Sequence, residues 1–213
     1  MVSLTRYGVK IDGSSLDVGQ WAYETEVALL LEVMSHNTVG AALLWGLSTH
    51  GLSVMITPYV HLVCNAGAGG LPTGAYVQFT PSIFSTSSPL GCNHANSAGA
   101  DPGEILFHEL VHALRNTARK WRQGSIGGIA PSYENDEEFI ALMLTNIYIS
   151  ERHRPLRRDI RGFVPLAQTS ESTVKSAAKI TLIEVVKRDH PEMFRRITRS
   201  SAKYNPLKLY AST

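Results

Sequence analysis

The stretch Phe107–Arg115, FHELVHALR, places two histidines four residues apart, with a glutamate directly after the first. The positions around these polar residues are apolar nearly all round, so a helix in this place is expected to be largely buried; they are Ile105, Leu106, Phe107, Leu110, Val111 and Leu114. Buried imidazole and carboxylate groups are costly unless something satisfies them. The chain is therefore expected to fold around a buried polar site, and a metal ion would satisfy all three groups.

The helix that carries this motif is predicted to run over Pro102–Trp121, because Asp101 supplies an N-cap and the proline suits the first turn. On that helix, His108 and His112 lie about 40° apart around the axis and about 6 Å apart along it. Both imidazoles can therefore bind one Zn²⁺ from the same side. Glu109 is rotated by about 100° from His108, so it need not be a ligand and can act as a general base toward water.

A catalytic zinc site also needs a third protein ligand and an open position for water. The longer metzincin pattern is excluded, because it requires Gly and His where the sequence has Arg115 and Ala118. A downstream helix with a carboxylate is another common solution, and the segment YENDEEFIALMLTNIY offers Glu134, Asp136, Glu137 and Glu138. Acidic residues at a helix start also favour the helix dipole without any metal. Periodicity barely separates Glu137 from Glu138, so both stay candidates.

The bulk composition is that of an ordinary soluble protein. The 213 residues suffice for one domain with a substantial core, and 44% of them are hydrophobic and 18% charged. A formal charge of +2 is too small to indicate nucleic acid or an anionic membrane as the main partner. No apolar run approaches the roughly 20 residues of a membrane span, and the N-terminus MVSLTRYGVKIDG lacks the apolar region of a secretory signal peptide. We expect a soluble protein with neither nucleic acid nor membrane as partner.

The order of patterns along the chain predicts an α+β fold. A helical spacing of apolar residues follows Leu16, and TVGAALLWGLSTHG predicts a second helix that ends at Gly51. LSVMITPYV and GAYVQFTPSIF are typical of strands, with Pro81 at an edge position or at a strand end. Further helices are expected at about Glu171–Arg188 and Pro191–Ser201.

We expect a single domain over residues 1–213. Residues 1–102 would supply helices, a sheet and a long loop rich in Ser, Gly, Asn and Pro. Residues 103–213 would supply the histidine helix, the glutamate helix and the C-terminal helices.

Taken together, FHELVHALR and YENDEEFIALMLTNIY resemble the zincin metallopeptidases. The resemblance is to a bacterial effector and toxin group with HELxHA followed by an EEFxA helix, as in injected effector proteases of pathogens and the catalytic domain of anthrax lethal factor. It covers about Ile105–Phe163, with weaker support from NTVGAALL and YNPLKLY. The chain departs from the lethal factor type at Leu142, where that type has a further acidic residue.

This resemblance implies that Glu138, directly before the aromatic residue of EFxA, is the third zinc ligand, and that Tyr133 stabilises the oxyanion. It implies a zincin-like fold, in which a small sheet has its edge strand beside the HExxH helix and holds a protein substrate as an added strand. We expect AYVQFTPSIF to supply that edge. It further implies an effector or toxin made in the bacterial cytoplasm and exported or injected by a specialised secretion system, with an immunity protein or a secretion-system component as candidate partners.

Three other features have both a structural and a functional interpretation. The segment ERHRPLRRDIRGF carries five arginines between Arg152 and Arg161. They could recognise an acidic substrate segment or phosphate, but a solvated helix end is favoured. Cys92 and His94 lie before the histidine helix, where a flexible loop near the cleft is favoured over a cap on the zinc. Cys64 is interpreted as a small buried residue, although two cysteines could form one disulfide.

The remaining histidines have no helical partner and are interpreted as structural or exposed; they are His36, His50, His61, His153 and His190.

The sequence thus predicts a zinc endopeptidase. Zn²⁺ would be bound by His108, His112 and Glu138. Glu109 would serve as general base and then acid, with Tyr133 at the oxyanion. Two rival interpretations are a non-enzymatic module with a structural metal or none, and a zinc hydrolase of non-peptide bonds.

Overall fold

The computed structural model describes residues 2–4, 7–61, 63–93, 97–122, 124, 133–157, 163–166 and 169–213. Within these residues, five strands form one mixed sheet in the order β1-β2-β3-β5-β4. The strands are β1 (Val2–Leu4), β2 (Val9–Ile11), β3 (Ser53–Thr57), β4 (Gly67–Leu71) and β5 (Gly74–Gln78). β2, β3 and β5 are parallel, while β1 and β4 run antiparallel to their neighbours.

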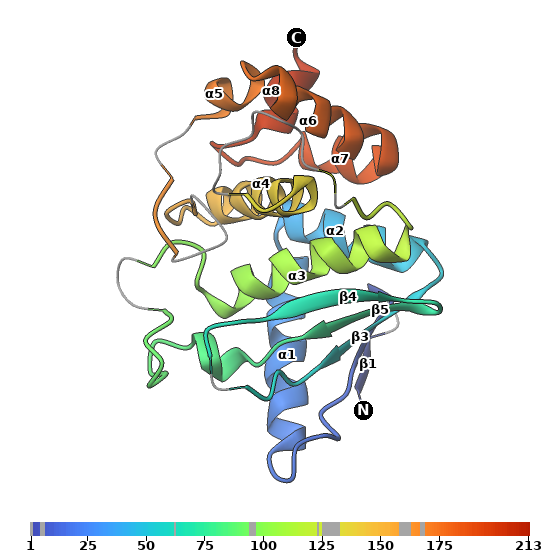
Figure 1. The fold of residues 1–213 in the computed structure, drawn as a ribbon, viewed down its shortest axis with the longest axis vertical. Coiled ribbons are helices and arrows are strands. Elements are labelled where there is room, and N and C mark those ends of the chain that lie inside the picture. Colours follow the sequence, from blue (N-terminus) through green and yellow to red (C-terminus); the bar gives the residue numbers. More distant parts are fainter. Residues whose placement is uncertain are drawn as a thin grey trace.

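One face of the sheet is buried and the other faces solvent, as the period of two along the strands requires. In β2 and β3, Val9, Ile11, Val54 and Ile56 are buried, whereas Lys10 between the first two is exposed. Two helices pack on the buried face: α1 (Gln20–Ser35) contacts β2, and α3 (Pro102–Thr117) lies along β4 and β5 (Figure 1). The histidine helix is therefore held directly against the sheet.

The remaining helices extend the core away from the sheet. α2 (Thr38–Thr49) and α4 (Asp136–Glu151) both contact α3, so α3 has packed neighbours on several sides. α4 lies between α3 and a C-terminal group made of α5 (Ser170–Val174), α6 (Ala177–Asp189), α7 (Pro191–Ile197) and α8 (Pro206–Ala211) (Figure 1). In the described part of the chain, no single helix is long and apolar enough to cross a membrane; only α1 and α2 together have that length and composition, and they are bent by 113°.

The α+β prediction is confirmed, and most helices lie where the sequence placed them. Three helix boundaries were wrong. The helix expected at about Pro191–Ser201 ends at Ile197. The histidine helix ends at Thr117 and does not reach Trp121. The helix expected over Glu171–Arg188 is two helices, α5 and α6, separated at Lys175 and Ser176.

The predicted edge strand was also wrong. β5, from the segment AYVQFTPSIF, lies between β3 and β4, so it is internal. Pro81 follows the end of this strand and begins the short 3-10 helix η2 (Pro81–Phe84). The edge beside α3 is formed by β4, which pattern reasoning missed because three of its five residues are glycine. Two of those glycines have a packing reason. A Cβ on Gly70 would lie 2.7 Å from Asn116 Oδ1 of α3, and one on Gly69 would lie 2.5 Å from Tyr76 Oη of β5.

A disulfide joins Cys64 to Cys92. It ties the segment between β3 and β4 to the loop that follows η2, across 28 positions of sequence. The interpretation of Cys64 as a buried residue was wrong, because its side chain is exposed and its sulfur is bonded. Cys92 is buried and also bonded, so it does not act as a thiolate cap on a metal.

Candidate metal centre

Two capped helices position the polar groups of the motif. The Asp101 carboxylate accepts a hydrogen bond of 3.0 Å from Gly103 N at the start of α3. Asn135 Oδ1 accepts one of 2.9 Å from the backbone N of Glu138 at the start of α4. Because these caps satisfy orphan N–H groups and fix the first turns, they set where each helix begins and which way its side chains face.

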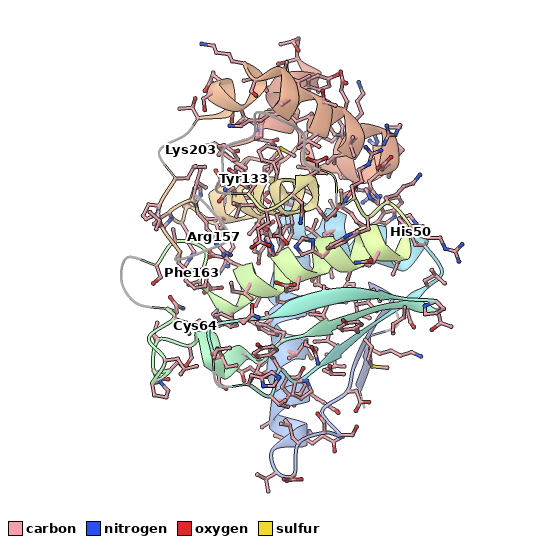
Figure 2. The ribbon with its side chains drawn as sticks, in the orientation of Figure 1. His50, Cys64, Tyr133, Arg157, Phe163 and Lys203 are labelled. Carbon is pink, nitrogen blue, oxygen red and sulfur yellow. A yellow bond between two sulfur atoms is a disulfide. The ribbon has the colours of Figure 1, made fainter. Side chains whose placement is uncertain are left out.

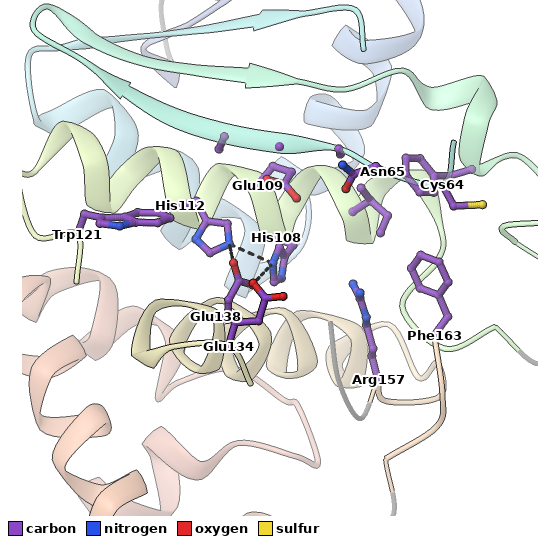
Figure 3. A pocket seen from close by; sticks show the side chains of 15 residues that line it. Cys64, Asn65, His108, Glu109, His112, Trp121, Glu134, Glu138, Arg157 and Phe163 are labelled. Carbon is purple, nitrogen blue, oxygen red and sulfur yellow. Dashed lines mark hydrogen bonds and ion pairs between the residues drawn. The ribbon is translucent and has the colours of Figure 1, made fainter. Parts of the chain in front are cut away.

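The imidazoles of α3 and one carboxylate of α4 converge on a single point (Figure 3). The two Nε2 atoms of His108 and His112 lie 3.1 Å apart. Glu138 Oε2 lies 3.3 Å from His108 Nε2, and its Oε1 lies 3.4 Å from His112 Nε2. Ligand atoms that share one tetrahedral zinc ion are about 3.3 Å apart, given metal–ligand bonds of about 2.0–2.1 Å. The three side chains, with one ligand atom each within 4.8 Å of the others, could therefore hold one metal ion.

The structure also distinguishes the two adjacent glutamates. Glu137 is fully buried and forms an ion pair with Arg115, with the Arg115 Nε donating to its carboxylate. A second hydrogen bond reaches Glu137 Oε2 from the backbone N of Arg122. Glu138, one position further around α4, faces the imidazoles instead. The metal-facing carboxylate is therefore Glu138, and Glu137 joins α3 to α4.

A hydroxyl behind His108 favours the tautomer that a metal requires. Thr145 Oγ1 donates to Ala141 O at 2.7 Å, which leaves its lone pairs facing His108 Nδ1 at 3.5 Å. If Nδ1 carries the proton, the Nε2 lone pair points into the cluster. His112 packs against the Trp121 ring at 5.1 Å, and among the described residues its Nδ1 has no hydrogen-bond partner.

The electrostatics of the cluster favour positive charge at its centre. Burial lowers the pKa of His108 to about 4, although Glu138 opposes this. Burial also disfavours charge on His112, but the Glu138 hydrogen bond and the Glu109 carboxylate together raise its pKa. For Glu138, burial alone would raise the pKa of the carboxyl group, yet the hydrogen bonds with both imidazoles hold this pKa well below the usual range. A bound cation would take the place of the proton that the metal-free cluster attracts.

Glu109 lies on the same helix, buried, but outside the converging donors. Burial raises the pKa of its carboxyl to about 7, while the neighbouring His112 acts in the opposite sense. A carboxyl group with a pKa near neutrality can both accept and release a proton under ordinary conditions. Its position beside the cluster is that expected for a general base.

A cavity of about 370 Å³ opens over the cluster. His108, Glu109, His112 and Glu138 all line it, so the four motif residues share one space (Figure 3). Its rim on the sheet side is formed by the edge strand β4 through Gly67 and Ala68 and by the segment before it. Its other lining residues are Cys64, Asn65, Ala66, Phe84, Ile105, Trp121, Glu134, Arg157 and Phe163.

Tyr133 does not join this group. Its ring packs edge-on against Phe139 at 5.1 Å beside α4 (Figure 2), and it is not among the described side chains that line the cavity. Its role at the oxyanion stays a prediction. His94 lies outside the described residues.

Pattern reasoning missed two cavity residues that the structure brings in. Trp121 follows the end of α3 and has no spacing that would indicate it. Arg157 belongs to the arginine-rich segment, for which a solvated helix end was favoured. Arg152 and Arg154 partly fit that interpretation, since they are partly exposed and pair with Asp101 and Glu104.

For Arg157 the solvated interpretation was wrong, because its side chain is buried in the cavity wall. Arg158 and Arg161 lie outside the described residues.

No family model matches the chain, and no match was found among curated proteins or among solved structures.

Proposed function

We propose that the protein is a zinc-dependent endopeptidase with a zincin-like fold. One observation carries the proposal: His108, His112 and Glu138 each present a ligand atom within 4.8 Å of the other two, with Glu109 beside them in the same cavity. A purely structural metal site is usually closed by four protein ligands. Here three donors converge among the described residues, and the cavity opens beside them.

Each residue has a definite task in peptide hydrolysis. His108, His112 and Glu138 would hold zinc, which supplies Lewis-acid chemistry to water and to the substrate carbonyl. Glu109 accepts a proton from the attacking water and then delivers it to the leaving amine nitrogen. Its pKa of about 7 suits both transfers near neutral pH. Thr145 holds the His108 ring through Nδ1.

A peptide substrate is favoured by the edge strand at the cavity rim. Within the described part of the chain, β4 pairs only with β5, so the backbone groups on its other side can pair with an extended peptide. Gly67 and Ala68 of this strand line the same cavity as the donors. A peptide added there would cross the metal centre in extended form.

The biological setting that we propose, a bacterial effector or toxin acting on a protein of a target cell, is supported by the HELxHA and EEFxA motifs. An exported protein would also be exposed to the oxidising conditions in which a disulfide such as Cys64–Cys92 persists.

The test compares wild type with Glu109→Ala in lysates of candidate target cells, followed by mapping of new protein N-termini. We expect about one zinc ion per chain in both proteins, the same circular dichroism spectrum, and a loss of cleavage of at least about a hundredfold in the variant. Glu171→Ala, which removes an exposed carboxylate from α5, is the matched control and should cleave like wild type.

Three results would count against the proposal. Wild type without bound zinc would remove the metal centre. Full activity of Glu109→Ala would remove the general base. A zinc-loaded wild type that creates no new N-termini would favour the structural-metal module or a hydrolase of other bonds.

A further inference from the structure

Arg157 is a buried cation in the wall of the metal cavity. Arg157 is 5% exposed and follows the end of α4 in the sequence. The guanidinium points into the cavity beside Phe163, with its Cζ 4.7 Å from the centre of that ring (Figure 3). The mechanism proposed above gives this side chain no task, although a charged side chain is rarely buried unless it has a structural or functional role.

The surrounding structure fixes Arg157 in this position. Asn146 of α4 binds its backbone from both sides: Arg157 N donates to Asn146 Oδ1 at 2.8 Å, and Asn146 Nδ2 donates to Arg157 O at 2.7 Å. The aliphatic stem packs on Gly99, where a Cβ would lie 2.7 Å from Arg157 Cδ. Gly99 also has a φ of +74°, which favours glycine. Backbone, stem and guanidinium are thus each held by a separate contact.

Arg157 lies to one side of the metal ligands. Along the cavity, Trp121 and His112 occupy one end, His108 follows, and Arg157 and Phe163 lie beyond it (Figure 3). The Phe163 ring beside the guanidinium is contacted by the Phe84 ring, with the ring centres 6.5 Å apart, and both side chains line the cavity.

We propose that Arg157 selects the substrate by binding the carboxylate of an acidic side chain next to the bond that is cut. This inference rests on the proposed peptidase function and names its substrate class. A guanidinium presents parallel N–H donors that match a carboxylate, which accepts both hydrogen bonds. The apolar side chains would pack against the methylene groups of a glutamate or aspartate, while β4 holds the peptide backbone.

The size of the preference follows from the type of bond. A hydrogen bond to a charged group contributes more than one between neutral groups, so an acidic residue should be favoured over its amide by about ten- to a hundredfold in kcat/KM.

The experiment begins with a proteome-derived peptide library digested by the zinc-loaded protein, which gives the residues around each cut. A cleaved peptide is then made in matched Glu and Gln forms at the acidic position. We expect wild type to prefer the Glu form by about ten- to a hundredfold, mainly through KM. In Arg157→Gln this ratio should fall close to one, and Arg157→Glu should prefer a Lys form. Arg195→Gln, which removes an exposed arginine from α7, should keep the wild-type ratio.

Equal cleavage of the Glu and Gln forms by wild type would overturn the proposal. So would an Arg157→Gln variant that loses activity equally on both forms, because that pattern indicates an effect on the fold or on the reacting centre. Thermal melting of each variant, and Arg157→Lys, which keeps the charge without the paired donors, separate folding from recognition. A Lys variant with part of the preference supports the proposal.

A binding measurement separates failure of this inference from failure of the peptidase function. N-acetylglutamate α-amide and its glutamine counterpart are titrated into the zinc-free protein and followed by NMR. If no peptide is cleaved but the glutamate compound binds more tightly, and Arg157→Gln removes the difference, carboxylate recognition stands and the peptidase function fails. If peptides are cleaved without an acidic preference, the reverse holds.

Discussion

The interface between α3 and α4 contains two buried groups of charged side chains that differ in how their charges are balanced. On one face of α4, Glu137 forms an ion pair with Arg115. On the next face, Glu138 meets His108 and His112. Both groups are buried at the same helix pair, and the two glutamates are adjacent in sequence.

The first group contains its own counter-charges. Arg115 donates to Glu137 and to Lys120 O and lies 3.7 Å from Asp189, so its charge is balanced within the protein. The second group has two imidazoles and a single carboxylate around an open cavity. Both groups are largely buried. What distinguishes the structural ion pair from the candidate metal centre is whether the protein itself balances the charges.

The largest effect is expected from Glu137→Gln. The substitution leaves the Arg115 guanidinium buried without its main counter-charge, which should lower the free energy of unfolding by about 3–5 kcal/mol. Urea denaturation of the zinc-free protein measures this change in the free energy of unfolding. The double variant Arg115→Met with Glu137→Met should recover much of the loss, since an apolar pair needs no counter-charge. A single variant as stable as wild type would show that the ion pair is not structural.

The next effect is expected from Glu138→Gln. The neutral amide keeps the shape of the side chain but is a weaker zinc ligand, so zinc affinity should fall by at least about ten- to a hundredfold. The zinc-free variant should lose less stability than Glu137→Gln. Competition with a chromogenic chelator measures the affinity. If Glu137→Gln instead weakens zinc binding and Glu138→Gln does not, the assignment of the two glutamates is reversed.

The smallest effect concerns pH and a histidine beside the structural ion pair. Burial, with the charges of Arg115 and His50, lowers the pKa of His190 to about 3. Between that value and the usual value of about 6.5, the unfolded chain binds a proton at this site and the folded chain does not. His190 therefore makes folding less favourable as pH falls through this window, by up to about 1.4 kcal/mol per pH unit.

His190→Gln should remove this contribution. The difference in unfolding free energy between wild type and variant, measured on zinc-free protein between pH 6.5 and 4.5, should then change with pH. A pH-independent difference would show that His190 titrates equally in the folded and unfolded states.

Much of the candidate metal centre was predictable, because the residues that define it lie a few positions apart in the sequence. The i, i+4 spacing sets the geometry of His108 and His112 on any helix, and the apolar residues around them indicated burial, which the structure confirms. The N-cap Asp101 was likewise readable, since capping depends on residues a few positions apart. The α+β class followed from the order of such local patterns.

Tertiary structure decided what depends on residues far apart in sequence. Periodicity could not choose between Glu137 and Glu138; the choice depends on which one meets Arg115, 22 positions earlier. The edge strand β4 lacked any strand pattern because three of its five residues are glycine, of which Gly70 fits against α3 and Gly69 against β5. Arg157 looked solvated within a basic segment, yet its contacts with Asn146 and Gly99 place it in the cavity.

The sequence alone determined a helix with two imidazoles and a carboxylate that had to be buried together, because helical geometry and the cost of burying polar groups act within a few residues. The motif resemblance named Glu138 as the carboxylate that completes the group, and the structure places it there. Only the fold determined which strand borders the cavity and which cation enters it, because these depend on long-range packing.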